Sequence, residues 1–446
     1  MRFGQVFSST LALAAGSLAR SVSDVQDTTS LTASLTSTTS ISVASGCSFS
    51  NALTATAQSD LDKLSGCQAV DGDIIITGDL GSASIANVKA IYGDLQIYNA
   101  TELEFFAADS VTTITGSLKL HGLTILSQLS FGSLTSVGAI NWVTLPNLGE
   151  TGLTQVTECN SILISDTIIS SLEGINPTNV EVFNVNNNKE MTSITSSIET
   201  ISNALTIAFN GDDTTVEFSD LIWANNITFY SVSSIDIPEI VAVNKSAGFF
   251  ESSVSSLEFP LITSIGGDLT IENNEDLSFI DFSNVTAIGG GLVIVNNTEL
   301  LSISLDEIKS VTGAVVLKGD FDNCTMEALK TVRGSFDLDT TGYADCSPFK
   351  KLSKNGGIQG DYTCKAATKK TSSSAKSSKT SSKSSSTASS DSSASSSASS
   401  ASSTDSSSSS ATSSVSSISS TSKAGAAALQ STSFFGTMAA ILLSLL

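Results

Sequence analysis

A short phrase recurs along this chain at a nearly constant interval. It reads GDLTIENNEDL at Gly267–Leu277, and similar phrases begin at Gly93, Gly116 and Gly290. The leading apolar residues of successive copies are mostly 22–23 residues apart, occasionally 20–21. A fixed period in the twenties is typical of a solenoid, in which no repeat buries its apolar face alone and each coil packs on the next. The period therefore constrains the fold more tightly than the length of 446 residues does.

The residues inside each copy predict strands. Apolar residues alternate with polar ones after the opening glycine, as at Leu95 and Ile97, and Val, Ile, Thr and Phe are abundant. Parallel strands stacked about 4.8 Å apart through right-handed crossovers form a right-handed parallel β-solenoid. We therefore predict an all-β fold of about 12–13 coils between Asp73 and Leu338, with a cap at each end.

Asparagine recurs where the first strand of a coil ends. Asn99, Asn186, Asn273 and Asn296 each stand four residues after the leading apolar position. Asparagine tolerates the left-handed turn conformation, and stacked amides can hydrogen-bond from coil to coil. We expect these residues to serve the architecture.

The segments outside the repeats have their own compositions. Ser59–Asp62 and the leucines at 53, 61 and 64 suit a short helix that covers the first coil. The predicted organisation is a secretory signal peptide at 1–19, a Ser/Thr-rich spacer at 20–46, the solenoid with its caps at 47–364, a disordered, Ser-rich, O-glycosylated stalk at 365–424 and a GPI-anchor signal at 425–446.

The C-terminus supports the anchor prediction. Small residues begin at Gly425, a spacer of eight residues follows, and the apolar run Phe434–Leu446 ends the sequence. A run of thirteen residues is too short to span a bilayer comfortably. We expect the lipid on Gly425, with Ala424 and Ser422 as alternatives, and removal of the tail that follows.

The net charge limits the binding partners of the chain, and the cysteine content bears on the redox compartment in which it folds. With 43 acidic and 21 basic residues the net charge is −22, which disfavours nucleic acid and anionic membrane surfaces. The six cysteines are an even number, and secretion makes disulfides permissible, with fifteen pairings on paper.

Catalytic motifs are scarce. The single histidine, His121, follows an apolar strand position and is expected at the surface, and no metal-binding cysteine pair or nucleophile elbow is present. We expect no catalysis and no cofactor or metal. The competing hypothesis is a carbohydrate-active β-helix with two carboxylates flanking a glycosidic bond. Its candidates are the strand-start Asp73, Asp94 and Asp268, whose recurrence favours turn capping, and the unrepeated Asp212 and Asp213.

A third hypothesis is an adhesin or receptor that binds glycan or protein. Exposed aromatic rings could stack on sugars, although at strand spacing most are expected in the core. The candidates are Tyr98, Trp142, Phe209, Trp223, Phe229 and Tyr230.

Six N-glycosylation sequons occur, and secretion makes them credible acceptors. At two of them, Asn99 and Asn296, the glycan reading competes with the stacked-amide reading, and both stay open. Asn323 precedes Cys324, a weaker acceptor context. The six are Asn99, Asn226, Asn244, Asn284, Asn296 and Asn323.

Several features together resemble a known family. They are the Gly-Asp-Leu-x-Ile-x-x-Asn coils, the opening TATAQSDLDKLSGC, the closing CSPFKKLSKNGGIQGDYTC and the serine stalk before SKAGAA. The chain resembles the fungal GPI-anchored cell-wall organisation proteins of the extracellular mutant 33 and sporulation-specific type. The resemblance implies a receptor L-domain-like solenoid without accepted catalytic mechanism, held at the plasma membrane by its GPI lipid or linked to wall glucan. It also implies a role in cell-wall integrity and the mannoprotein layer.

The resemblance further implies disulfides Cys47–Cys67 and Cys346–Cys364. Cys159 and Cys324 depart from the simplest pattern. They lie about seven coils, or roughly 34 Å, apart, far beyond disulfide reach. Cys159 falls at the inward position that Val137 holds one coil earlier, which favours a buried free thiol. Cys324 and Cys346 are one coil apart, so a bond between them is an alternative.

Overall fold

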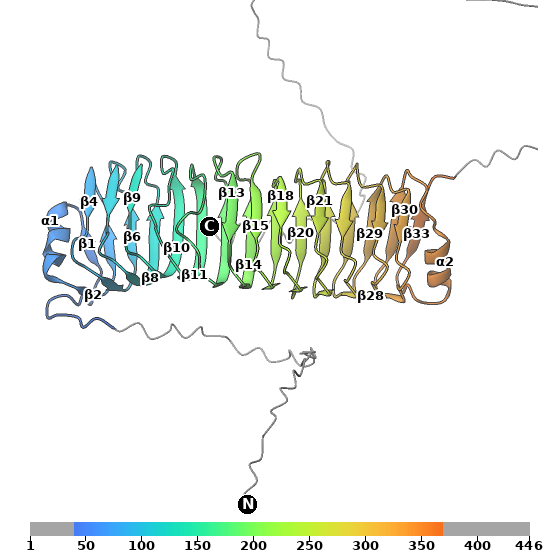
Figure 1. The fold of residues 1–446 in the computed structure, drawn as a ribbon, viewed down its shortest axis with the longest axis horizontal. Helices are drawn as coiled ribbons and strands as arrows, with labels where there is room; N and C mark the ends of the chain where they lie inside the picture. Colours follow the sequence, from blue (N-terminus) through green and yellow to red (C-terminus); the bar gives the residue numbers. More distant parts are fainter. Residues whose placement is uncertain (1–39, 369–446) are drawn as a thin grey trace, which may run out of the picture. The chain divides into compact units, whose positions relative to one another are not determined.

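The computed structural model describes residues 40–368, and its coils stack into a parallel β-solenoid of about 14 turns (Figure 1). The predicted fold is confirmed. The rod is longer than the repeat phrase indicated, because both cap segments also contribute strands: Leu53 begins one before the first recognisable copy, and Tyr362 begins one after the last.

One long parallel sheet of 23 strands runs along the whole solenoid. Its principal strands, one per coil, are β1 (Leu53–Ala55), β3 (Ile74–Ile76), β6 (Leu95–Tyr98), β8 (Thr113–His121), β10 (Ser136–Leu145), β11 (Glu158–Thr167), β12 (Asn179–Asn186), β14 (Thr200–Ala208), β17 (Ile227–Tyr230), β20 (Ala247–Phe250), β23 (Leu269–Glu272), β26 (Leu292–Val295), β29 (Val315–Gly319), β32 (Phe336–Thr340) and β33 (Tyr362–Lys365). In eight of these coils a short strand of the same sheet precedes the principal strand. The short strands are β2 (Ala69–Asp71), β5 (Ala90–Tyr92), β16 (Trp223–Ala224), β19 (Ala242–Val243), β22 (Ser264–Ile265), β25 (Ala287–Ile288), β28 (Ser310–Val311) and β31 (Thr331–Val332).

Four small parallel sheets form on another side of the coils, where the second apolar segment of the repeat lies. They are β4 (Ser82–Ser84) with β7 (Phe105–Ala107) and β9 (Gln128–Ser130); β13 (Ser193–Ser196) with β15 (Thr215–Phe218) and β18 (Ser234–Asp236); β21 (Ser256–Glu258) with β24 (Phe279–Asp281); and β27 (Ser302–Ser304) with β30 (Asn323–Thr325).

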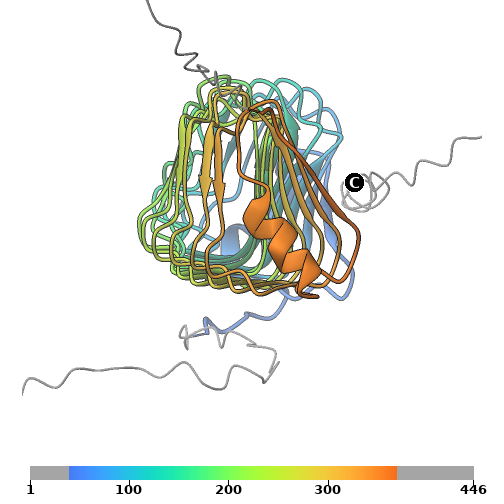
Figure 2. The same cartoon turned by 90° about the vertical axis from the view of Figure 1, so that its right-hand side faces the viewer.

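Equivalent residues of successive coils pair in register, so the interior consists of columns of like side chains. Leu95 pairs with Leu118, and Leu118 pairs with Ile140, and all three are buried. Viewed along the stack, the coils surround one common interior (Figure 2). Burying each such side chain contributes about 1.5–3 kcal/mol, which a single coil cannot achieve because its own faces would remain open.

A short helix covers the N-terminal end, as predicted, although its start differs. Helix α1 (Gln58–Leu61) continues into the 3₁₀ helix η1 (Asp62–Gly66), whereas Leu53 belongs to β1. The Asp60 carboxylate accepts hydrogen bonds from the backbone N–H groups of Thr56 and Ala57, so the helix begins one residue before Ser59. Cys47 and Cys67 form a disulfide beside this helix.

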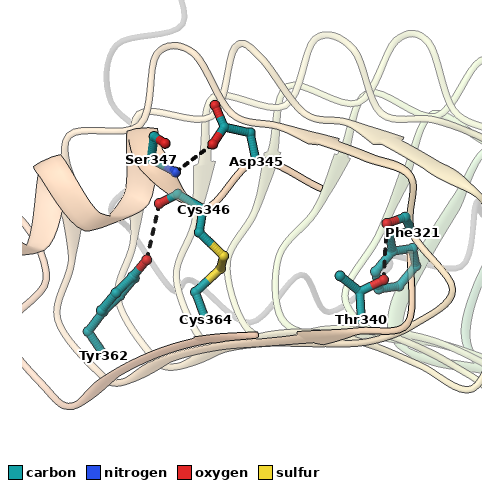
Figure 3. The surroundings of a disulfide bond; sticks show 7 residues. All are labelled: Phe321, Thr340, Asp345, Cys346, Ser347, Tyr362 and Cys364. Carbon is teal, nitrogen blue, oxygen red and sulfur yellow. Dashed lines mark hydrogen bonds between the residues drawn. A yellow bond between two sulfur atoms is a disulfide. The ribbon is translucent and has the colours of Figure 1, made fainter. Parts of the chain in front are cut away.

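The C-terminal end is closed by helix α2 (Ser347–Lys354), which lies across the last coil (Figure 2). Its Phe349 ring packs on Phe336 of β32 with centroids 4.6 Å apart. Cys346 is bonded to Cys364, and the Tyr362 hydroxyl donates to the Cys346 carbonyl at 3.2 Å (Figure 3). The alternative Cys324–Cys346 bond is therefore wrong.

The described residues also include the end of the spacer. The Ile41 N–H donates to the Tyr92 hydroxyl at 2.7 Å, and Val43 packs against the core. The predicted signal peptide, most of the stalk and the anchor signal lie outside the described residues. No helix within residues 40–368 is long and apolar enough to cross a membrane.

Candidate functional site

The principal strands end at a corner where one residue takes a left-handed backbone conformation. Asn99, Asn273 and Asn296 occupy this corner with φ of 53°, 59° and 57°. Asn186 was predicted at the same position and is not there. The corner belongs to Asn187, with φ 56°, because the residue in register with Ile162 of the preceding coil is Phe183 and not Val182.

The interior amide ladder is formed by the residue after the corner. Asn274 is fully buried and donates to the Asn297 Oδ1 at 3.1 Å, and Asn188 likewise donates to Asn210 at 3.0 Å. Val232 occupies the equivalent place in the coil after Asn210, so the ladder is interrupted there. The stacked amides predicted from the sequence thus exist mainly one residue later than expected.

Five of the six sequon asparagines are exposed, and Asn226 is half-buried. Most donate one hydrogen bond to the preceding coil, and an amide nitrogen carries two hydrogens, so a second remains for glycan attachment. The surface bond of Asn296 and glycosylation therefore do not exclude each other. Asn226 donates to the Asn203 carbonyl and Asn284 to the Pro260 carbonyl. Asn244 donates to the Asn225 Oδ1, Asn296 to the Asn273 Oδ1 and Asn323 to the Ser302 hydroxyl.

The strand-start aspartates bind the next coil. Asp73 accepts from the Asp94 N–H at 2.8 Å, and Asp268 accepts from the Gly291 N–H. Asp94 accepts from the Ser117 N–H at 2.8 Å and from the Lys119 ammonium at 2.7 Å. Partial burial acts to raise the pKa of Asp94, but the bonds from Lys119 and Ser117 outweigh it and the pKa lies below its ordinary value.

The remaining polar candidates are at the surface. Asp212 and Asp213 are exposed in the turn after Asn210, and His121 is exposed at the end of β8. Thr214, which follows the two aspartates, is buried and donates its hydroxyl to the Met191 carbonyl at 2.6 Å, so the turn is tied down.

Most of the aromatic candidates are buried or half-buried, and one is largely exposed. Trp142 and Phe229 are fully buried, while Phe209 is 46% exposed. The half-buried members are Tyr98, Trp223 and Tyr230.

Three aromatic rings on successive coils form what we call the aromatic strip: Phe209, Tyr230 and Phe250. The Phe209 and Tyr230 centroids are 5.3 Å apart with an interplanar angle of 25°, and Tyr230 and Phe250 are 4.6 Å apart at 16°. Gly248 makes room for the strip, since a Cβ there would lie 2.4 Å from the Phe250 ring. The strip follows the edge of the long sheet where the principal strands end.

A hollow of about 420 Å³ adjoins the aromatic strip. We call it the corner hollow; its lining includes the Phe209 ring, two carboxylates and two hydroxyls. Its residues are Phe209, Asn210, Asp212, Ser231, Glu251 and Ser253. Three of them, Phe209, Ser231 and Glu251, hold the left-handed corner with φ of 53°, 52° and 46°.

The surroundings of the strip are acidic. Burial, followed by the charges of Glu251 and Glu272, raises the pKa of Tyr230, which keeps its hydroxyl protonated at neutral pH. Glu272 stands in register with Phe250 on the next coil. The arrangement thus places the partly exposed Phe209 ring beside several hydrogen-bond acceptors.

The two unpaired cysteines lie in the interior. Cys159 pairs in register with Val137, as predicted, and burial raises the pKa of its thiol to about 11. Burial raises the pKa of Cys324 to about 12. Both thiols are protonated and shielded, so neither is a nucleophile at neutral pH.

Comparison with known proteins connects this solenoid to fungal cell walls. The chain is 42% identical over 320 residues to the cell wall mannoprotein PST1 of Saccharomyces cerevisiae, covering 71% of this chain and 72% of that protein. The chain belongs to the ECM33 family of fungal cell-wall proteins. The cell surface GPI-anchored protein ECM33 of Candida albicans is 38% identical over 346 residues, 76% of this chain and 84% of that protein. Protein ecm33 of Aspergillus fumigatus is 36% identical over 71% of this chain and 80% of its own length.

No family model matches the chain, and no solved structure matches it. Within this ECM33-family chain, sequence reasoning missed Phe250, Gly248 and Glu251. The run Ala247–Phe250 has no apolar–polar alternation, and all four residues are largely buried. The sequence pattern therefore did not predict that the Phe250 ring faces outward. The retrospective signal is an aromatic residue at the same coil position as Tyr230, one repeat later.

Proposed function

We propose that this protein is a non-catalytic, GPI-anchored cell-surface glycoprotein that supports the organisation and integrity of the fungal cell wall. The observation that carries the non-catalytic part is the use of the repeated carboxylates. Asp73, Asp94 and Asp268 each accept a backbone N–H from the following coil, so they hold the stack together. A glycosidase of the two-carboxylate type needs carboxylates that are free to face one glycosidic bond, and these three are engaged by the stack.

The proposed location follows from the family and from the C-terminal sequence. Its relatives include proteins named as cell wall mannoprotein and cell surface GPI-anchored protein. We place the lipid on Gly425, with Ala424 and Ser422 as alternatives, and wall glucan and mannoprotein as the partners of the mature chain. Attachment to the outer leaflet of the plasma membrane or covalent transfer to the wall would both hold the solenoid among these polymers.

The distribution of sequons supports a rod surrounded by glycans on some sides only. The six asparagines lie at corners, in turns or on β30, and none is an outward residue of a principal strand of the long sheet. Glycans on these residues would leave the outward side chains of the principal strands free of direct attachment. Regular stacking beneath them supplies a stiff spacer, because every coil is tied to its neighbours by backbone bonds.

The integrity role is tested in a deletion strain grown on wall-perturbing dyes. We expect full-length protein to restore growth and a chain ending at Lys423, which lacks the anchor signal, to fail while being secreted in folded form. Recovery of the truncated chain from the medium, resistant to protease, controls for its folding. Failure of the full-length chain to restore growth would contradict the integrity role, and rescue by the truncated chain would contradict the need for the anchor.

The non-catalytic assignment has a separate test. Purified full-length protein is incubated with β-glucan and with mannan, and new reducing ends are counted. We expect no release above buffer. Release that disappears in Asp212→Ala would establish the carbohydrate-active alternative instead.

A further inference from the structure

We propose that the aromatic strip and the corner hollow form a binding site for a neutral chain of β-linked glucose units, with a sugar ring stacked on Phe209 and its hydroxyls bonded to Asp212, Glu251, Ser231 and Ser253. The wall-organising role does not require this site, and the site is tested by a separate measurement.

The backbone at Phe209 carries the first part of the argument. The left-handed conformation costs a residue with a Cβ about 1–2 kcal/mol, and asparagine and glycine bear it best. Most other coils place asparagine or glycine at this corner, as at Asn99, Gly122, Asn187 and Asn273, and two coils place Thr144 and Asp166 there. Among the described residues other than glycine that have a left-handed backbone, Phe209, with φ 53°, is the one aromatic residue, and strained backbone positions cluster at binding sites.

The second part is the mechanical support of the ring. One face of Phe209 packs on Tyr230, and Tyr230 packs on Phe250, which lies over Gly248. This backing fixes the Phe209 ring at the end of a stack while 46% of the residue stays exposed. A ring already immobilised loses little side-chain entropy when a ligand stacks on it.

The third part is the polar lining. Sites for small ligands combine an apolar wall with a few polar groups that fix orientation. Here the Asp212 and Glu251 carboxylates accept hydrogen bonds from hydroxyls, and the Ser231 and Ser253 hydroxyls donate or accept. Two carboxylates beside one exposed aromatic ring match a ligand that has hydroxyls at its edge and C–H groups on its face.

The charge and shape of the site select among sugars. Carboxylates at Asp212, Glu251 and Glu272, together with the net charge of −22, repel phosphorylated or acidic glycans. A β-linked glucose ring carries all its hydroxyls equatorially, so both faces present C–H groups to an aromatic ring. Mannose has an axial hydroxyl that stands off one face, which weakens stacking there.

Binding is measured by calorimetric titration of the full-length protein with a linear β-linked glucose hexasaccharide and, in a second arm, a linear α-linked mannose hexasaccharide. We expect the glucose chain to bind more tightly. Phe209→Asn, which installs the residue used at other corners, should weaken glucose binding at least about tenfold, because it removes the stacking face. Glu251→Gln should weaken it about tenfold through loss of a charged acceptor.

The matched control is Phe279→Asn, which removes a phenylalanine that is 52% exposed on β24, away from the strip. We expect it to bind like the unaltered protein. Absence of glucose binding in the unaltered protein, equal affinity for the mannose chain, or unchanged binding by Phe209→Asn would each overturn the assignment. An unfolding curve of Phe209→Asn that retains the cooperative transition shows that any loss of binding comes from the site.

Discussion

Two stretches of the solenoid form the same left-handed corner with different residues. In the regular stretch around β23 and β26, Asn273 and Asn296 take the corner, and Asn274 donates to Asn297 inside. In the strip stretch, from β14 to β20, the corner residues are Phe209, Ser231 and Glu251 and the interior ladder is interrupted at Val232. The regular stretch serves stacking alone, whereas the strip stretch accepts a less favourable backbone and gains an exposed ring beside polar groups.

The largest effect is expected in the regular stretch from Asn274→Ala. Asn274 is fully buried, donates to the Phe249 carbonyl at 3.1 Å and accepts from the Ser252 N–H at 3.0 Å. Removing the amide leaves these groups buried without partners, which costs about 1–3 kcal/mol each. We expect the free energy of unfolding to fall by about 3 kcal/mol or more in denaturant titrations. Asn273→Gly, at the half-buried corner beside it, should change the free energy of unfolding by less than about 0.5 kcal/mol. Equal losses in the two variants would remove the distinction between corner and ladder.

Gly248→Ala probes the strip stretch. The added Cβ would lie 2.4 Å from the Phe250 ring, so the ring must move and disturb its contact with Tyr230. We expect a loss of about 1–3 kcal/mol in thermal or denaturant unfolding. The control is Thr270→Ala, which pairs in register with Gly248 on the next coil and should be nearly neutral. A neutral Gly248→Ala would show that the strip is loosely packed and not a fixed support.

The pH dependence of stability tests whether the strand-start carboxylate of Asp94 stabilises the stack of coils. The pKa of Asp94 is lowered in the folded state, so its contribution is present above the unfolded-state pKa and is lost as pH falls through the folded-state value. Unfolding curves between neutral pH and about pH 2 should show a shallower acid loss for Asp94→Asn, by a few tenths of a kcal/mol for a pair this exposed. An unchanged slope in Asp94→Asn would mean that its bonds do not stabilise the stack.

The repeat spacing predicted the regular stretch of the solenoid but did not predict the aromatic strip. A spacing of 22–23 residues was enough to place Cys159 behind Val137 and to identify strand-start aspartates as coil caps, because stacked coils repeat their contacts. It misplaced Asn186, which stands four residues after Val182, because the leading inward position of that coil is Phe183, which pairs in register with Ile162 and Leu205. It could not show Phe250 facing outward, since periodicity assigns apolar residues to the interior and a ring stacked on its neighbour is an exception.

The central claim is that Phe209 is held at its corner for binding and not for stability, and the free energy of unfolding of Phe209→Asn tests it most directly. Relief of the left-handed strain, about 1–2 kcal/mol, should offset the lost ring contact with Tyr230, about 0.5–1.5 kcal/mol. We therefore predict a net change within about 1 kcal/mol, against about 3–5 kcal/mol lost in the buried comparison Phe229→Ala. A loss above about 2 kcal/mol in Phe209→Asn would show that the ring is a packing element of the solenoid and would contradict the account.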